Sequence, residues 1–150
     1  MINNSIRHLR WFIALFIALS APLMVTQAEQ KITVTDHDIH YMAFTSAMLT
    51  PEIAKAYAIQ RSKSLGVVTV SVLKSADQKA VEAFVRGKVR NPIGQLQELD
   101  FKTIKEDQAI YYLATFDFAN AQKLSFDILV SPDGQTASHS LKFPQQLFID

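Results

Sequence analysis

From Lys31 to the C-terminus, apolar and polar residues alternate along most of the chain, and turn-forming residues interrupt the alternation. Because successive side chains of a β-strand point to opposite faces, this period of two is typical of strands with one buried face. The interruptions come about every ten residues, a spacing found in antiparallel β-sandwiches. The sequence therefore predicts an all-β fold, an antiparallel immunoglobulin-like β-sandwich of seven or eight strands.

One stretch departs from the strand pattern. Residues 50–52, Thr-Pro-Glu, are typical of a helix start: Thr caps free backbone N–H groups, Pro fits the first helical position, and Glu favours the positive end of the helix dipole. Ile53, Ala56 and Tyr57 then fall on one helical face. The sequence predicts one short helix insert near residues 50–58, docked through that face.

The segments 80–90 and 96–105 are expected to pair as a hairpin around the turn at 91–95. One register satisfies both faces, with Arg90 opposite Leu96, Lys88 opposite Glu98 and Arg86 opposite Asp100. The basic stripe on the first strand is about 13 Å long at strand rise and suits a polyanion. We interpret it instead as the basic half of cross-strand ion pairs.

Two further strands and one further hairpin are expected in the rest of the chain. Residues 66–74 are apolar on both faces, which predicts a central strand. Residues 109–117 are also apolar on both faces, so the pattern does not decide which face points inward. The segment is either a central strand that is covered on both faces or a strand that presents an exposed aromatic patch to a partner. The turn Ser131-Pro132-Asp133-Gly134 predicts a hairpin that pairs Val130 with Gln135 and Phe126 with His139.

Residues 1–28 have the order of a secretory signal peptide. Arg7 and Arg10 precede the apolar run at 11–19, and small residues lead to Ala28, after which we expect cleavage. A membrane anchor is the alternative, but the run is about half of the ~20 residues that a span needs, and Pro22 follows it. We therefore expect a single domain at 29–150 in the periplasm, with no stable transmembrane segment after cleavage.

The expected mature domain is close to neutral. It contains 13 basic and 14 acidic residues, for a net charge of −1. A domain without a strong overall charge has no long-range field to attract nucleic acid, so no nucleic acid partner is expected. The chain has no cysteine, so the hydrophobic core must hold the fold without disulfides.

No catalytic residue or cofactor is predicted. Cysteine nucleophiles are absent, no Gly-x-Ser-x-Gly motif occurs, and the four glycines are too far apart for a phosphate-binding loop. Asp36, Asp38 and His40 are spaced by two, so a strand would place them on one face, where they form a weak alternative metal site. A solvated strand face is the preferred interpretation, and we predict no metal.

The predicted binding residues are Tyr41, Tyr57, Gln60, Arg61 and Lys63. They gather polar and aromatic groups around the helix and its junction with the next strand, a place where binding residues are common. If this junction is extended, Arg61 and Lys63 share a face and suit a carboxylate or phosphate. A structural role, in which Arg61 pairs with Glu52 or Asp36, stays open beside it.

Five motifs resemble a family of small exported bacterial proteins catalogued as domain of unknown function 4426. They are HYMAF at 40–44, LTPEIAKAYAIQRSK at 49–63, GQLQELDF at 94–101, AIYY at 109–112 and FPQQ at 143–146. The resemblance implies a periplasmic β-sandwich and supplies no catalytic residue or ligand.

We hypothesise a non-enzymatic interaction module that binds a protein or envelope component. A small-molecule or metal-binding protein is the alternative, and an enzyme is the third possibility.

Overall fold

A computed structural model describes residues 30–132 and 136–149, and it confirms the predicted antiparallel β-sandwich. The described elements are β1 (Gln30–Val34), β2 (His37–Thr45), the 3-10 helix η1 (Ser46–Met48), α2 (Pro51–Ala56), β3 (Leu65–Lys74), β4 (Ala83–Arg90), β5 (Leu96–Leu99), β6 (Lys102–Glu106), β7 (Ala109–Asp117), β8 (Gln122–Pro132) and β9 (His139–Leu147).

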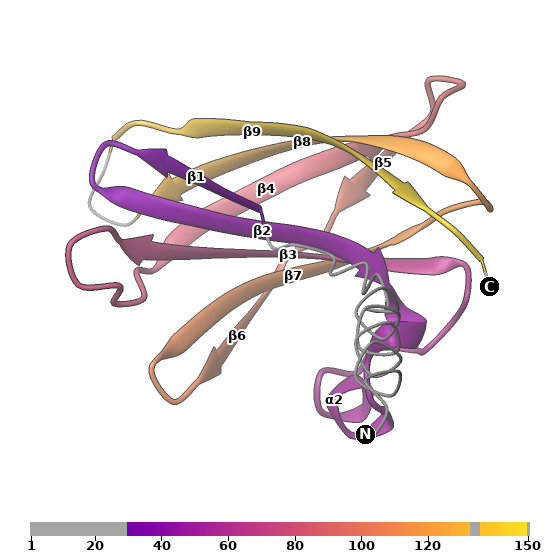
Figure 1. Cartoon of the computed structure of the whole chain (residues 1–150), viewed down its shortest axis with the longest axis horizontal. Coiled ribbons are helices and arrows are strands. Elements are labelled where there is room, and N and C mark those ends of the chain that lie inside the picture. Colours follow the sequence, from indigo (N-terminus) through magenta and orange to yellow (C-terminus); the bar gives the residue numbers. More distant parts are fainter. Residues whose placement is uncertain (1–29, 133–135, 150) are drawn as a thin grey trace, which may run out of the picture.

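Two sheets pack face to face (Figure 1). Sheet A has the strand order β1-β2-β3-β7-β6, and sheet B has the order β5-β4-β8-β9. All neighbouring strands are antiparallel. Nine strands are described where seven or eight are predicted, because 96–105 divides into β5 in sheet B and β6 in sheet A.

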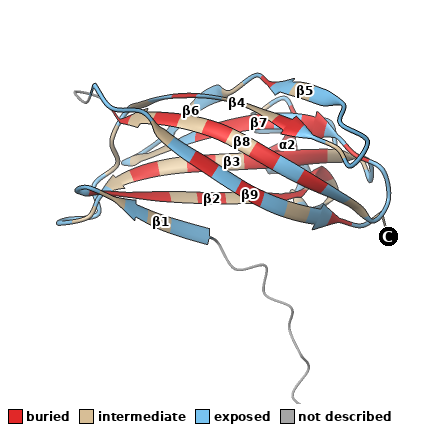
Figure 2. Cartoon of the chain, turned by 90° about the horizontal axis from the view of Figure 1, so that it is seen from above, coloured by how far each residue is buried: buried red, intermediate tan, exposed pale blue. Residues whose placement is uncertain are grey.

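The core lies between the two sheets and is built from alternate residues of their strands. Figure 2 shows this alternation as buried and exposed bands along the central strands. The largest fully buried side chains include Phe126, Ile39, Leu124 and Ile128. Phe126 stacks on Phe143 with ring centroids 4.8 Å apart and an interplanar angle of 7°. The period of two in the sequence is therefore the signature of this interior.

The β4–β5 hairpin has the predicted register, with Arg90 opposite Leu96 and Lys88 opposite Glu98. However, β5 ends at Leu99, and the chain crosses to sheet A, where Lys102 begins β6. Asp100 therefore does not pair with Arg86, whose neighbour on the other side is Leu129. The two-residue crossing buries part of Phe101 against the core, which favours leaving sheet B at this point.

The predicted register of the last hairpin is wrong by four residues. Val130 pairs with His139, and Phe126 pairs with Phe143. The strand β8 continues through Ser131 and Pro132, so the connection is longer than a tight turn at 131–134. Gln135, the predicted partner of Val130, lies outside the described residues. The observed register stacks two core aromatic rings, a contribution that turn chemistry alone does not reveal.

Both faces of β7 are covered over its centre. Tyr112, Ala114 and Phe116 point into the core between the sheets. Leu113 points outward and packs in a second buried cluster with Phe44, Ile59 and Val67. The sequence left the direction of this strand open. The structure turns Tyr112, Ala114 and Phe116 inward and covers the opposite face at Leu113, while Tyr111 is 41% exposed.

The helix α2 begins as predicted, at the end of the segment that follows β2 (Figure 1). The Thr50 hydroxyl accepts a hydrogen bond from the Ile53 N–H at 3.3 Å, and Pro51 occupies the first turn. The predicted docking face is wrong, because Ala54 is buried whereas Ile53 is 42% exposed. The helix has only six residues and ends before Ala58, whose φ of 53° turns the chain so that Ile59 packs inward.

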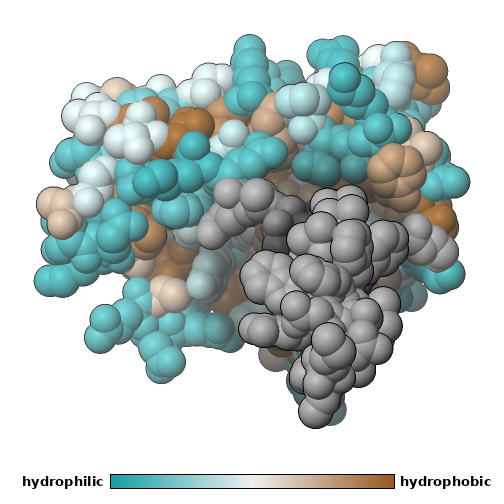
Figure 3. Space-filling model, viewed as in Figure 1, coloured by the Kyte–Doolittle hydropathy of each residue, from teal (hydrophilic) through white to brown (hydrophobic). Residues whose placement is uncertain are grey.

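Hydrophilic side chains cover most of the surface in Figure 3, and apolar residues show between them. Among residues 30–132 and 136–149, no helix is long and apolar enough to cross a membrane.

Candidate functional site

The structure does not bring the five predicted binding residues together. Tyr41 lies in the core, 9% exposed, and its ring centroid is 4.6 Å from that of Phe143. Tyr57 lies at the end of α2 against the outer face of sheet A. Gln60, Arg61 and Lys63 are exposed on the segment between α2 and β3. Tyr41 is therefore a packing residue, and Tyr57 is separated from it by the sheet.

The segment between α2 and β3 is tied to η1 by hydrogen bonds. The buried Ser46 hydroxyl contacts the carbonyls of Gln60 and Ser62, each at 3.1 Å, and accepts from the Ser62 N–H at 2.9 Å. Arg61 donates from Nη2 to the Ala47 carbonyl at 2.9 Å. These contacts assign Arg61 a role in holding the segment. Lys63 lies beside a separate hollow of about 300 Å³ near Met48 and Phe148.

The pKa of Glu52 on α2 is lowered. Its main cause is a hydrogen bond from the residue's own backbone N–H, followed by one from the Thr50 hydroxyl, and the positive charge of Arg61 adds a weaker attraction. Arg61 therefore acts on Glu52 through space, while its own hydrogen bond goes to η1.

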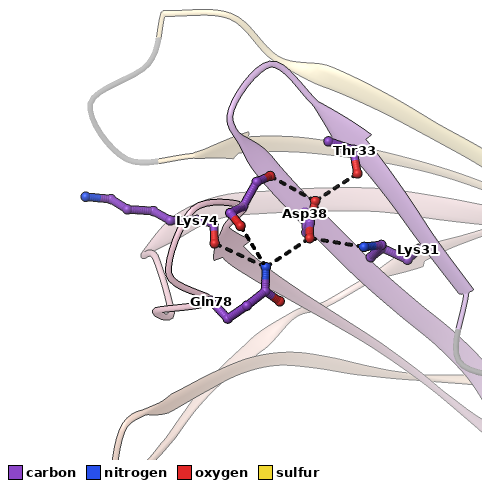
Figure 4. A network of polar contacts seen from close by, with 6 residues as sticks. Lys31, Thr33, Asp38, Lys74 and Gln78 are labelled. Atoms are coloured by element: carbon purple, nitrogen blue, oxygen red, sulfur yellow. Dashed lines mark hydrogen bonds and ion pairs between the residues drawn. The ribbon is translucent and has the colours of Figure 1, made fainter.

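Asp38 is buried inside a network of donors (Figure 4). Its Oδ1 accepts from Thr33 Oγ1 at 2.8 Å and Ser75 Oγ at 2.9 Å. Its Oδ2 accepts from Gln78 Nε2 at 3.1 Å and Lys31 Nζ at 3.2 Å. The hydrogen bond from Thr33, followed by those from Gln78 and Ser75, holds the pKa of Asp38 far below its ordinary value.

The three residues of the weak metal alternative, Asp36, Asp38 and His40, lie in three different surroundings. Asp36 lies in the two-residue turn between β1 and β2, and its Oδ1 is 2.8 Å from His37 Nδ1. The carboxylate of Asp38 is surrounded by the donors just described, and His40 lines a groove further along β2. Within the described ranges, no group of three His, Cys, Asp or Glu side chains is placed to hold a metal ion.

A groove of about 510 Å³ lies on the outer face of sheet A, beside α2. Its floor contains a cross-strand row of Met42, Thr69 and Leu113 on β2, β3 and β7. Side chains from the α2 region, from β6 and β7, and from the β2 and β3 positions beyond the row complete the lining: Phe44, Leu49, Ile53, Tyr57, Ile104, Glu106, Tyr111, His40, Val70 and Ser71. The lining is mainly apolar, with polar groups at its ends.

Tyr57 and Glu106 join the two sides of this groove. The Tyr57 hydroxyl donates a hydrogen bond to Glu106 Oε1, so α2 is connected to the end of β6. This hydrogen bond is the main cause that raises the pKa of Tyr57 to about 12, and partial burial adds to it. Tyr57 is the one predicted binding residue that lines the groove.

Sequence reasoning missed most of the groove. The floor residues Met42 and Thr69 lie on strands whose other face forms the core, and no motif marks their own face as a groove. One signal was available, since Tyr111 and Leu113 make the second face of β7 apolar. That face borders the groove through Tyr111, which is partly exposed, and through Leu113, which is buried.

Comparison with solved structures supports the fold. A crystal structure of a DUF4426 family protein from Pseudomonas aeruginosa PAO1 has a TM-score of 0.74 and 34% identity, covering 83% of this chain and 98% of that chain. A copper-bound variant of FetP from uropathogenic Escherichia coli strain F11 has a TM-score of 0.57, covering 79% of this chain and 94% of that chain. Its identity is 8%, so this second likeness shows the fold alone.

Sequence comparison points the same way. No curated protein matches the sequence. The family description "Domain of unknown function (DUF4426)" matches residues 31–150, which include every described strand residue except Gln30. Together with the structure from P. aeruginosa, this match establishes that the chain belongs to the DUF4426 family.

Proposed function

We propose that the protein is a non-enzymatic binding module of the periplasm, which holds the apolar part of a protein or envelope component in the groove beside α2. The observation that carries the proposal is the groove itself, about 510 Å³ with a mainly apolar lining. This volume lies within the range of known ligand sites, which are mostly apolar with a few polar groups.

The floor of the groove favours binding because it is rigid. Met42, Thr69 and Leu113 sit on adjacent central strands of sheet A. Behind them, the same strands are packed against sheet B through the core. Sites on a rigid sheet lose little conformational freedom when a ligand binds, so more of the contact energy appears as affinity.

The chemistry of the groove favours binding over catalysis. Its acidic side chain, Glu106, is engaged by the Tyr57 hydroxyl. The pKa of Tyr57 is raised to about 12, whereas a general acid or base works best with a pKa near the working pH. The export pattern of residues 1–28 supports the periplasmic location.

A carboxylate placed in the floor tests the proposal directly. Wild-type protein and two variants, Thr69→Glu and Thr69→Val, are titrated with the apolar fluorescent probe N-phenyl-1-naphthylamine. We expect Thr69→Glu to weaken binding at least tenfold or so, because burying a charge against an apolar ligand is unfavourable. Thr69→Val keeps the shape and the branched side chain, so it should bind as well as wild type.

Thr115→Glu provides the matched control. Thr115 lies on β7, is exposed on the same outer face of sheet A as Thr69, and does not line the groove. Equal probe binding by wild type and Thr69→Glu would overturn the proposed site. Ile53 lines the groove and is 42% exposed. In cells, a photo-crosslinking residue at position 53 should trap a bound component, and the added change Thr69→Glu should abolish this crosslink.

A further inference from the structure

The outer face of sheet B is basic, although the expected mature domain has a net charge of −1. The inward residues of β4, β5, β8 and β9 are buried in the core, so the alternate residues of these strands form the outer face. Seven of those outward residues carry charge: Arg86, Lys88, Arg90, Lys123 and Lys142 are basic, and Glu98 and Asp127 are acidic. This face therefore has a net charge of +3.

The acidic residues are confined to one row across the sheet. Glu98, Lys88, Asp127 and Lys142 are successive neighbours on β5, β4, β8 and β9. Lys142 Nζ is 3.8 Å from Asp127 Oδ2 within this row. The row alternates in sign and is balanced, so the excess positive charge comes from the rows beside it.

Those neighbouring rows hold cations without carboxylates. Arg90 has Leu96 and Ser125 as cross-strand neighbours, and Arg86 has Leu129. Arg86 would have faced Asp100, but β5 ends at Leu99 and the chain leaves sheet B there. Of the three cations on β4, the register therefore places a carboxylate opposite Lys88 alone. Arg86 and Arg90 remain exposed, about 13 Å apart at strand rise.

Exposed apolar side chains accompany the cations. Phe84 is 66% exposed on the outward side of β4, two residues before Arg86. Leu96 is 47% exposed opposite Arg90. A hollow of about 340 Å³ on the same face is lined by Leu96 and bordered by Lys88, Arg90 and Lys142.

We propose that this face docks the protein on an anionic phospholipid surface. Anionic headgroups attract basic side chains near the surface, and aromatic rings settle at the level of the headgroups. The combination of excess positive charge and an exposed aromatic residue therefore favours lipid. Docking through sheet B leaves the groove on sheet A facing away from the membrane.

The first experiment measures co-sedimentation of the exported protein with vesicles of phosphatidylcholine, alone or with 30% phosphatidylglycerol. We expect binding only when phosphatidylglycerol is present, and loss of binding in 0.5 M salt, where screening is strong. The double variant Arg86→Glu/Arg90→Glu should bind at least about tenfold more weakly. The control Lys55→Glu/Lys102→Glu makes the same change in net charge on α2 and β6, and should bind as wild type.

The second experiment places a reporter on the face. The chain has one tryptophan, Trp11, so Phe84→Trp in a Trp11→Phe background carries a single tryptophan at position 84. Its emission should shift to the blue with phosphatidylglycerol vesicles and stay unchanged with phosphatidylcholine alone. Tyr111→Trp in the same background reports on sheet A and should not shift.

Absence of vesicle binding by wild type, or equal loss in both charge-reversal variants, would overturn the proposal. Binding of poly-glutamate without binding of vesicles would overturn it in favour of an acidic protein partner. The result is independent of the groove, because Thr69→Glu leaves sheet B unchanged and should retain vesicle binding.

Discussion

Asp38 connects three parts of sheet A through one carboxylate. Asp38 itself lies on β2, and its donors come from β1 and from the turn that follows β3. Those hydrogen bonds lower the pKa of Asp38. Ionised Asp38 therefore stabilises the folded state relative to the unfolded state. The stabilisation is fully present above the ordinary pKa of about 3.8 and is lost as the pH falls toward the lower folded value.

We therefore predict that Asp38→Asn lowers the free energy of unfolding at pH 7 and flattens its decline below pH 4 or so. Urea denaturation of wild type and variant at pH 7, 5, 4 and 3 measures this. Asp107→Asn, at an exposed turn position with a φ of 48°, is the control and should follow wild type. Parallel pH curves for Asp38→Asn and wild type would contradict the assigned role.

Tyr57 gives a second prediction at this scale. Tyr57→Phe removes the hydrogen bond to Glu106 and should destabilise the α2 segment by about 0.5–1 kcal/mol. Amide hydrogen exchange at residues 50–59 should become faster, while the core strands stay protected. Because the pKa of Tyr57 is raised, the difference from Tyr57→Phe should shrink as the pH rises above 10 or so.

The control is Tyr111→Phe, a partly exposed tyrosine that also lines the groove. If both variants changed exchange equally, the hydrogen bond to Glu106 would not be the contact that holds α2.

Single residues were the hardest part to predict from the sequence. Tyr41 looked like a binding residue because tyrosine carries a polar group, yet its ring packs on Phe143, a residue more than 100 positions away in the chain. Asp38 was assigned to a solvated strand face, yet two of its donors, Ser75 and Gln78, lie 37 and 40 residues later in the chain. Local patterns carry no information on such long-range contacts.

At the scale of elements, one position on β3 has no room for a larger side chain. Gly66 lies opposite Phe116 on β7, and a Cβ at position 66 would be 2.3 Å from the Phe116 ring. We predict that Gly66→Ala destabilises the protein by about 1–3 kcal/mol through overpacking. Phe116→Leu in the same chain should recover part of this loss, because the smaller side chain makes room.

A double-mutant cycle from urea denaturation measures the coupling between positions 66 and 116. Gly94→Ala is the comparison: a Cβ there meets nothing within 4 Å, so its cost comes from the φ of 87° alone and should be about 1 kcal/mol. Purely additive costs at 66 and 116 would show that the ring does not limit position 66.

Elements were predictable where their cause is local. The start of α2 follows from Thr50 and Pro51, and the β4–β5 register follows from a short turn with matching faces. The β8–β9 register was missed because its determinant is the stacking of Phe126 on Phe143, not the composition of the loop. The face of α2 was missed because the helix ends after six residues, before a regular face is established.

For the whole molecule, the alternation of residues was sufficient to predict the sandwich, but not the order of its strands. β3 pairs with β7, and β4 pairs with β8, so neighbours in the chain are divided between the sheets. The alternation indicates the buried face of most strands, but it contains no short-range signal for these partners. The groove depends on that order, since it lies across β2, β3, β7 and β6.

A prediction at this scale concerns export. We expect protein recovered from the periplasm to begin at Glu29, with the mass of residues 29–150. Intact mass spectrometry and N-terminal sequencing check this, and Ala28→Lys should block processing because the cleavage site requires small residues. Recovery of wild type with Met1 or its adjacent residues intact would contradict both the cleavage site and the proposed compartment.

The pairing of β3 with β7 also has a consequence for the newly made chain. Synthesis proceeds from the N-terminus, so β2 can pair with β3 as soon as both are available. The opposite edge of β3 must wait until β7 appears, more than 40 residues later, since Val70 pairs with Tyr112. During that interval a strand that is apolar on both faces has an open edge, which is a template for aggregation. We expect nascent chains truncated between β3 and β7 to be the form of this protein that depends most on chaperones.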